Sequence, residues 1–273
     1  MTAVLVTGAT GFIGSAIMRR LAEDGHQAIP FRGDLLSSGF PDLSGIAATH
    51  CIHAAWYTNH ADYLTHEVNR DWVGASVRLC EAFLKAGGMR FVGIGTCLEY
   101  DVASVDGACT EDATPLAPDT LYARCKLRLF EELGVGSSSF AWARVFFVYG
   151  PGDRSGRLVP YMLDRFKGGE RAGPTFGALR RDYIHVDDLA GQIVRIALSD
   201  AQGAINTGTG LAPTLSEMFA AGARAFGRGD LALANDETGG QPPLIQADMS
   251  RFRRQIGEPQ ARDFATGIKD LVG

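Results

Sequence analysis

A glycine-rich turn after the first predicted strand constrains this chain most. Residues 3–7 form a short β-branched apolar run, and Gly8, Gly11 and Gly14 come directly after it. Apolar residues then recur at helical spacing over 13–21. Glycine permits a tight turn and lets the helix pack closely on the strand, while the helix N-terminus offers N–H donors to an anion. The pattern predicts a strand, a turn and a helix.

Strands and helices continue to alternate along the first half of the chain. Further apolar strands are predicted at 28–31, 51–55, 90–94 and 140–148, with helices such as 72–86 and 122–133 between them. This alternation is typical of a parallel sheet with helices on both faces. We therefore predict an α/β fold, a Rossmann-type doubly wound parallel sheet with a smaller C-terminal substrate-binding lobe.

The composition changes after Pro151-Gly152 to mixed helix and loop with many glycines. We assign residues 1–152 to the Rossmann domain, whose sheet is completed by segments around 181–210. Residues 153–273 form mainly the substrate-binding lobe. Helices are predicted in this second part at 187–199, which can return to the sheet, and at 215–226.

Composition and charge exclude several classes of partner. The 273 residues are 46% hydrophobic and 21% charged, with a net charge of -5, so neither nucleic acid nor a membrane is expected as a partner. The chain has no apolar run of membrane-spanning length and no secretory signal pattern, and we expect a cytoplasmic protein. Its five cysteines are scattered and lack a Cys-x-x-Cys pair, which favours reduced thiols and no metal site.

The glycine turn between a strand and a helix predicts a dinucleotide-binding site, the alternative being a purely structural turn. After the second strand the chain continues Phe31-Arg-Gly-Asp34. An acidic residue at this place bonds the ribose 2′-hydroxyl of NAD, whereas Arg32 can hold the 2′-phosphate of NADP, so the sequence favours NADP. The alternative is that Arg32 is a solvated residue and Asp34 a turn former.

Tyr122 and Lys126 lie four residues apart in a predicted helix, with Asp119 and Thr120 as capping candidates before it. This spacing places the phenol and the ammonium on one helix face. A lysine charge there would lower the pKa of the tyrosine and suit it to proton transfer at neutral pH. Taken alone, such a pair is more often structural.

Together with the N-terminal glycines, further segments give the chain a resemblance to the extended short-chain dehydrogenase/reductase family along nearly its full length. It is most similar to the nucleotide-sugar epimerases, dehydratases and 4-ketoreductases of that family. The matching landmarks are His53-Ala-Ala55, Gly95-Thr96, Tyr122 with Lys126, Arg144-Val-Phe-Phe-Val-Tyr-Gly-Pro151, Arg181-Asp-Tyr-Ile-His-Val-Asp-Asp188 and Asn206-Thr-Gly-Thr-Gly210.

The resemblance implies roles for individual residues. Thr96, four residues before Tyr100, would hydrogen-bond the substrate oxygen and complete a catalytic triad with Tyr122 and Lys126. Arg181 would face the substrate diphosphate, which a guanidinium fork binds well; the alternative is a salt bridge to neighbouring acids. The predicted substrate-binding residues are Thr96, Cys97, Phe147 and Arg181. The predicted cofactor-binding residues are Gly8, Thr10, Gly11, Phe12, Ile13, Gly14, Arg32, Asp34, Leu35, Ala54, Ala55, Tyr122 and Lys126.

The chain also departs from that family. Dehydratases of this type carry Asp-Glu directly after the active-site threonine, where this chain has Cys97 and Leu98. Neither can act as a carboxyl group, and strand alternation should aim Glu99 away from the face used by Leu98, so dehydration is not expected. Cys97 is either a tuned thiol or, more simply, a buried inert one.

Three further positions differ from the usual pattern. The segment between the second strand and Cys51 is short for the usual helix and third strand, which can alter the adenine pocket. A helix asparagine thought to help hold the lysine through water aligns with Trp72, while Asn69 lies one turn earlier. Phe147 stands where sugar-specific relatives often have Asn, which leaves the sugar and its nucleotide open.

The leading prediction is an enzyme that transfers hydride from NADPH to a keto group of a nucleotide-activated deoxysugar, with Tyr122 giving the proton, Lys126 tuning it and Thr96 polarising the carbonyl. One alternative is an NAD-dependent 4-epimerase that uses the same triad without net redox turnover. Another is a non-catalytic dinucleotide-sensing regulatory protein on the same fold. A homodimer formed through the helices at 72–86 and 122–133 is expected.

Overall fold

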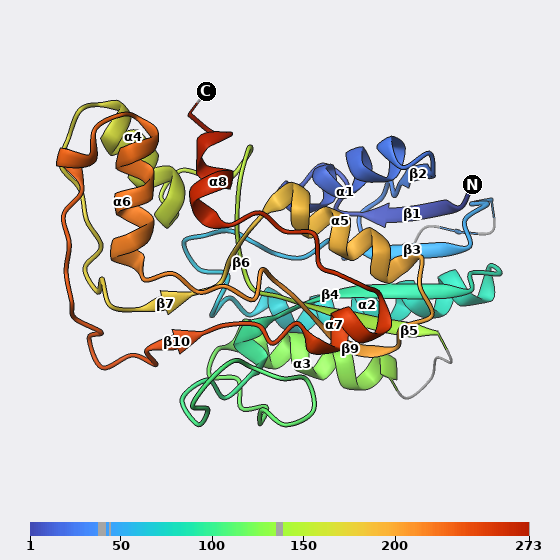
Figure 1. The fold of residues 1–273 in the computed structure, drawn as a ribbon. Helices are drawn as coiled ribbons and strands as arrows, with labels where there is room; N and C mark the ends of the chain where they lie inside the picture. Colours follow the sequence, from blue (N-terminus) through green and yellow to red (C-terminus); the bar gives the residue numbers. More distant parts are fainter. Residues whose placement is uncertain (38–41, 44, 135–138, 273) are drawn as a thin grey trace.

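Parallel strands form the central sheet of the computed structural model, which describes residues 1–37, 42–43, 45–134 and 139–272. Six strands lie in the order β2-β1-β3-β4-β5-β9, and every neighbouring pair is parallel. Figure 1 shows this sheet with the glycine-rich turn leading from β1 into α1. The strands are β1 (Ala3–Thr7), β2 (Gln27–Pro30), β3 (His50–His53), β4 (Arg90–Thr96), β5 (Phe140–Val145) and β9 (Gly203–Thr207).

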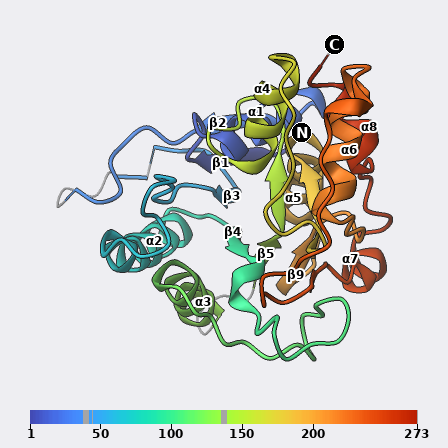
Figure 2. The ribbon, with the colours of Figure 1, turned by 90° about the vertical axis from the view of Figure 1, so that its left-hand side faces the viewer.

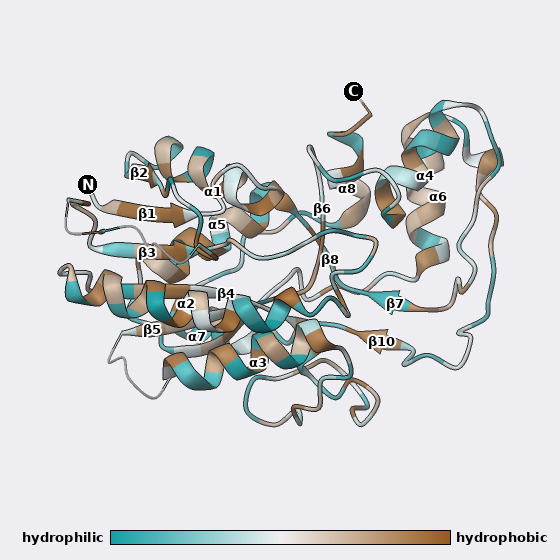
Figure 3. Cartoon of the chain, turned by 180° about the vertical axis from the view of Figure 1, so that it is seen from behind, coloured by the Kyte–Doolittle hydropathy of each residue, from teal (hydrophilic) through white to brown (hydrophobic). Residues whose placement is uncertain are grey.

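Helices cover both faces of the sheet because successive strand residues point to opposite sides. Val4 and Val6 belong to a core shared with α1 (Phe12–Glu23) and α5 (Val186–Ala197). Leu5, between them, belongs to the other core, shared with α2 (Val68–Lys85) and α3 (Leu121–Gly134). Figure 2 shows α2 and α3 on one side of the sheet and α1 and α5 on the other. In Figure 3, β1 is brown, whereas α2 and α3 mix teal with brown as amphipathic helices do.

A smaller lobe lies beyond the carboxyl ends of the strands (Figure 1). Its core joins Phe166, Phe219 and Phe264 from three helices. Two short parallel pairs, β6 with β8 and β7 with β10, lie between this lobe and the sheet, and α7 packs against β9. The bounds are β6 (Phe147–Tyr149), α4 (Leu158–Lys167), β7 (Arg180–Arg181), β8 (Tyr183–His185), α6 (Leu215–Ala225), β10 (Leu244–Ile245), α7 (Ser250–Gln255) and α8 (Phe264–Lys269), with short 3-10 turns at Cys97–Glu99 and Gly229–Leu231.

The predicted α/β class and the Rossmann-type parallel sheet are confirmed. The division of the chain at residue 152 stays a prediction, although β9 and α5 both come from the second half of the chain. The single strand predicted over 140–148 is wrong, because the backbone changes partner there. Phe146 N donates to Thr207 O in the sheet, and Phe147 N donates to Asp182 O outside it, so β6 leaves the sheet and pairs with β8.

The segment between β2 and β3 contains no helix or strand among its described residues, and residues 38–41 and 44 of it lie outside the described part. Helix α2 begins at Val68, four residues before the predicted start. Over the described ranges, no helix is both long and apolar enough to span a bilayer.

Candidate active site

The glycine turn after β1 has a geometry that only glycine satisfies. Gly8 adopts a φ of +64° and accepts a hydrogen bond of 2.9 Å from Gly11 N. A Cβ on Gly14 would lie 2.0 Å from Gly8 O. Helix α1 begins at this turn with Gly11 as its N-cap, and its first turn has neither a capping side chain nor an acidic residue. Such a helix start suits a phosphate group.

The chain after β3 forms the opposite wall of this turn. A Cβ on Gly8 would lie 2.8 Å from both Ala54 C and Ala55 N. Thr7 Oγ1 accepts a hydrogen bond from Ala55 N at 3.2 Å and is 2.7 Å from Nδ1 of His53. Burial and then the charge of Lys126 lower the pKa of His53 to about 3, so this histidine is a neutral structural link.

These contacts bring the glycine turn and the chain after β3 into close backbone packing at the start of α1, the arrangement in which a helix N-terminus binds the diphosphate of a dinucleotide. Backbone N–H groups of the turn and of α1 would hold it, and the absence of side chains at Gly8 and Gly11 lets it approach. Among the other predicted cofactor-binding residues near the turn, Thr10 is exposed, and Phe12 and Ile13 are half-buried.

The residues predicted to select the cofactor lie just beyond β2. Arg32 is exposed, and no hydrogen bond or ion pair joins it to another described residue. Asp34 is exposed too, and its Oδ1 accepts a hydrogen bond of 2.9 Å from Leu36 N, the geometry of an Asx turn. The Leu35 side chain is buried in the core with α2 and α3, so only its backbone is available to a ligand.

Helix α3 brings the predicted catalytic residues together. Ala123 N donates to Thr120 Oγ1 at 3.2 Å, so Thr120 caps the helix as predicted. Lys126 Nζ lies 5.8 Å from the centroid of the Tyr122 ring, one helical turn away. The Tyr122 side chain lies close enough to the Thr96 side chain, at the end of β4, for Thr96 to lower the pKa of Tyr122. Two hydroxyl groups and a buried ammonium therefore meet at one place.

The expected tuning of Tyr122 by the lysine charge is wrong for this structure. Burial, followed by the nearby Tyr63, Glu99 and Cys97, raises the pKa of Tyr122, and the Thr96 side chain opposes the rise. Burial also lowers the pKa of Lys126 to about 7, against the smaller effect of Glu99. Desolvation dominates both groups because Lys126 is buried and Tyr122 is half-buried among other side chains. Tyr122 is therefore a neutral phenol, suited to donating a proton.

The surroundings of Lys126 include a residue that sequence reasoning missed. Lys126 Nζ donates to Ile94 O at 2.8 Å and lies 3.8 Å from the centroid of the Trp56 ring. The Trp56 indole N–H donates in turn to Asn69 Oδ1 at 2.7 Å. The Trp56 indole therefore lies between Asn69 and Lys126 and contacts both. The ring centroid of Trp72 lies 5.9 Å from that of Trp56. An aromatic residue directly after His53-Ala-Ala55 was the available signal.

A second missed residue is Tyr63, whose ring meets that of Tyr122 edge-on at 5.2 Å. It comes from the turn region before α2, where the sequence has no motif that would indicate it. Burial raises the pKa of Tyr63, and the charge of Arg157 lowers it. Its half-buried side chain lies beside Tyr122 in the candidate site.

Cys97 connects the catalytic residues with the neighbouring lobe. It is buried directly after Thr96, and burial strongly raises the pKa of its thiol, with Arg181 opposing the rise. A thiol of raised pKa is a poor proton-transfer group, which favours the inert alternative. Cys97 is close enough to both Tyr122 and Arg181 for their pKa values and its own to be coupled, so it lies between the predicted triad and the substrate-binding candidates.

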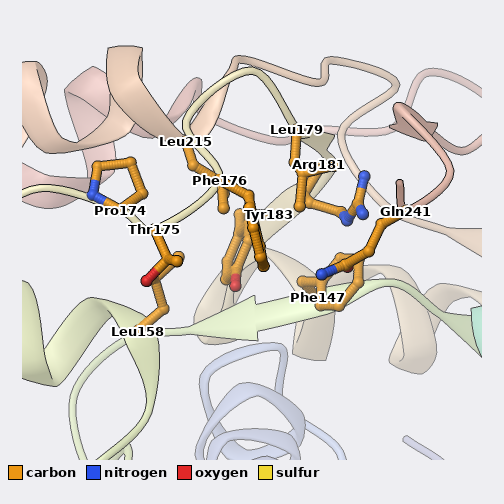
Figure 4. Close-up of a pocket in the computed structure, with 10 residues that line it drawn as sticks. All are labelled: Phe147, Leu158, Pro174, Thr175, Phe176, Leu179, Arg181, Tyr183, Leu215 and Gln241. Atoms are coloured by element: carbon orange, nitrogen blue, oxygen red, sulfur yellow. The ribbon is translucent and has the colours of Figure 1, made fainter. Parts of the chain in front are cut away.

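A pocket of about 400 Å³ joins the predicted substrate-binding residues Phe147 and Arg181. The rings of Phe147 and Tyr183 stack on each other, with their centroids 5.2 Å apart. Figure 4 shows Arg181, Gln241 and Phe147 on one side and Pro174 with Thr175 on the other. The remaining lining residues are Leu158, Phe176, Leu179, Tyr183 and Leu215.

Arg181 is a buried cation without an acidic partner among the described residues. Its Nη1 donates to Arg180 O at 2.9 Å and to Pro243 O at 3.3 Å. The neighbouring Asp182 is instead held by Thr209, Gly210 and Ala247, so the salt-bridge alternative is not observed. Burial lowers the pKa of Arg181. A guanidinium in this state can bind an anion entering the pocket.

No carboxylate occupies the places that elimination chemistry would require. Leu98 is half-buried, and Glu99 points away from the pocket toward Trp142 and Arg144. In the described part of the chain, no group of three or more His, Cys, Asp and Glu side chains could hold a metal ion. The five cysteines, all described, are buried and unpaired as disulfides.

Comparison with known proteins places this geometry in context. Residues 4–208 match the model of the NAD dependent epimerase/dehydratase family. The chain is 25% identical to a UDP-glucose 4-epimerase of Azospirillum brasilense, over 97% of this chain and 89% of that protein. It is 26% identical to the structure of MoeE5 in complex with UDP-glucose and NAD, with a TM-score of 0.77, over 99% of this chain and 97% of the other. A UDP-glucose 4-epimerase structure from Thermotoga maritima, 23% identical, has a TM-score of 0.81 over 99% and 97% of the two chains.

Proposed function

The chain belongs to the NAD dependent epimerase/dehydratase family, and from this premise we propose that it is a 4-epimerase of a nucleotide-activated sugar. The observation that carries this proposal is the meeting of Thr96, Tyr122 and Lys126 at a site without a catalytic carboxyl pair. Elimination needs an acid and a base that Cys97 and Leu98 do not supply. Full-length similarity to UDP-glucose 4-epimerases supports the same reaction.

The chain's own residues would handle the proton and the substrate oxygen. The phenolate form of Tyr122 would take the proton of the sugar hydroxyl as a carbonyl forms, and the resulting phenol would return it when the hydroxyl is restored, so the proton balance is zero. Positive charge on Lys126 would stabilise that phenolate against the burial that raises the pKa of Tyr122. Thr96 hydrogen-bonds the same oxygen, and Lys126 supplies positive charge behind the phenol. NAD, when bound along the glycine turn and Ala54-Ala55, supplies the acceptance and return of hydride.

The pocket that Arg181 and Phe147 line would hold the rest of the substrate. Arg181, buried and without an acidic partner, provides the cation for a phosphate group. The stacked rings of Phe147 and Tyr183 offer an apolar surface to the ligand. A pocket of about 400 Å³ lies within the usual range for small-molecule sites. Nucleotide sugars combine these features, an anionic diphosphate with flat and apolar surfaces.

A second candidate is the 4-ketoreductase expected from the sequence. The exposed Arg32 at the end of β2 favours it, because no acidic side chain competes there for a ribose hydroxyl and an NADP 2′-phosphate would find a cation. Asp34 is engaged in its own turn. An exchangeable NADP suits a reductase, whereas the family description and the NAD bound to MoeE5 favour NAD.

One experiment separates the two candidates. Purified protein is denatured, the released nucleotide is identified, and native protein is incubated with UDP-glucose and related nucleotide sugars for product chromatography. The epimerase predicts retained NAD and interconversion of C4 epimers without added cofactor. The reductase predicts no retained NAD and a loss of the reduced-nicotinamide absorbance when NADPH and a nucleotide 4-ketosugar are added. Arg32→Ala should slow this oxidation with NADPH and leave the rate with NADH unchanged.

Assembly and location remain proposals. We propose a homodimer through α2 and α3, which pack on each other on one side of the sheet (Figure 2). Analytical ultracentrifugation would test it, with a monomer as the contradicting result. Cytoplasmic location also stays a prediction.

A further inference from the structure

A buried ion pair lies directly beneath the catalytic threonine. Glu99 and Arg144 are 0% and 1% exposed, and Glu99 Oε2 accepts a hydrogen bond of 2.8 Å from Arg144 Nε. The mechanism proposed above uses neither residue. Burying two charges is costly, and a pair of apolar residues often stabilises a core as well. Arg144 Nη1 has no hydrogen-bond partner, so stability alone is a weak reason for this pair.

The contacts of Glu99 point to the threonine. Glu99 Oε1 accepts the backbone N–H of Thr96 at 2.9 Å and the indole N–H of Trp142 at 3.0 Å. Thr96 Oγ1 accepts the N–H of Leu98 at 3.3 Å, which closes a reciprocal capping box over the 3-10 turn. The last residue of β4 is thereby fixed at its backbone by one carboxylate oxygen.

The strand itself is shaped to admit this carboxylate. A Cβ on Gly95 would lie 2.1 Å from Trp142 Nε1 and 2.6 Å from Glu99 Oε1, and one on Gly93 would lie 2.3 Å from the Trp142 ring. Glycines in the interior of a strand weaken it unless another group needs the space. Here two glycines make room for the indole and the carboxylate that hold Thr96.

We propose that Glu99 is a positioning residue that holds the Thr96 hydroxyl against the Tyr122 hydroxyl by accepting the backbone N–H of Thr96. This inference rests on the proposed function, because it assumes that Thr96 and Tyr122 contact the same substrate oxygen. Misplacement of a reacting group by a fraction of an ångström lowers turnover more than binding. The role of Glu99 should therefore appear in kcat.

Two double variants isolate the hydrogen-bond acceptor from the buried charge. Glu99→Gln/Arg144→Met removes both charges and keeps an amide oxygen for Thr96 N, whereas Glu99→Leu/Arg144→Met removes both charges and the acceptor. Neither leaves an unpaired buried charge. We expect kcat of the leucine variant to be about tenfold below that of the glutamine variant, with equal KM, which corresponds to the loss of one well-made hydrogen bond. Equal kcat values, or a difference confined to KM, would overturn the proposal.

A third variant covers the case in which a double variant fails to fold, as judged by thermal unfolding. Glu99→Asp keeps the charge beside Arg144 and withdraws the carboxylate from Thr96 by one methylene, so its kcat should fall by about tenfold as well. Amide hydrogen exchange at the peptide holding Thr96 gives a readout independent of substrate. Faster exchange in the aspartate variant than in wild type is expected, and unchanged exchange would contradict the contact. If wild type turns over no nucleotide sugar, the proposed function fails, and exchange alone decides the role of Glu99.

Discussion

Replacing Gly14 with alanine tests whether the turn after β1 is built for a diphosphate. A Cβ at this position would lie 2.0 Å from Gly8 O and 2.7 Å from Gly8 C. Contacts of Cβ below 3.0 Å are essentially never observed, so the turn must move by at least about 1 Å. Helix propensity alone would favour alanine by about 1 kcal/mol. Overpacking against backbone costs about 1–3 kcal/mol, and because backbone cannot yield as a side chain does, the steric effect should win.

The displacement should affect cofactor binding more than folding. Gly8 O also accepts from Gly11 N at 2.9 Å, so moving it disturbs the N–H groups that would meet the phosphates. We expect the Kd for NAD to rise at least tenfold, about 1.4 kcal/mol, with a fall of a few degrees in Tm. Calorimetric titration and thermal unfolding measure the two effects.

Gly45→Ala provides the control, because a Cβ there would lie within 4 Å of no other group in the described part of the chain. It should leave both Kd and Tm close to wild type. An unchanged Kd in Gly14→Ala, with the protein folded, would refute the assignment of the turn to the cofactor.

Three further predictions concern Lys126, Trp56 and Arg181. Burial lowers the pKa of Lys126 to about 7, so between about pH 7 and pH 10 the unfolded chain binds a proton that the folded chain has released. The free energy of unfolding of wild type, relative to that of Lys126→Met, should therefore rise with pH by at most about 1.4 kcal/mol per pH unit. A pH-independent difference between the two proteins in urea unfolding would contradict this. Trp56→Leu removes the ring whose centroid lies 3.8 Å from Lys126 Nζ and should lower kcat several-fold. Trp56→Phe keeps a ring and should lower kcat less. Equal kcat values in the two variants would count against the cation–π contact. Arg181→Lys keeps the charge and loses the guanidinium fork, so KM for the nucleotide sugar should rise about tenfold with little change in kcat, and an unchanged KM in steady-state kinetics would remove Arg181 from the substrate site.

Local patterns in the sequence were sufficient for the parallel sheet and for the helix that carries Tyr122 and Lys126. Strand periodicity placed β1 and β4 because their residues are buried on both faces, and the four-residue spacing placed Tyr122 and Lys126 together on α3. The break after β5 escaped prediction because residues 140–148 are apolar throughout, and only the position of Asp182 and Thr207 decides where that backbone changes partner.

The electrostatics of the site depend on burial, which a linear pattern does not contain. Spacing predicted that Lys126 would lower the pKa of Tyr122, but desolvation raises it. Trp56 and Tyr63 reach the site from the chain after β3, and no periodicity connects them with α3. The contact between Glu99 and Thr96 was missed for a different reason. Strand alternation predicted that Glu99 points away from the face used by Leu98, but Glu99 lies in a 3-10 turn after β4, and the fold of that turn directs its carboxylate to Thr96 N.

The central claim is that Tyr122 exchanges the proton of a nucleotide-sugar hydroxyl. The most direct test compares wild type with Tyr122→Phe in the interconversion of UDP-glucose and its C4 epimer, with retained NAD measured in both. The variant should keep its NAD and fold normally but lose turnover by about a hundredfold or more, because it retains the ring and lacks only the hydroxyl. Wild-type rates in the variant, or a wild type that interconverts no nucleotide-sugar epimers, would contradict the account.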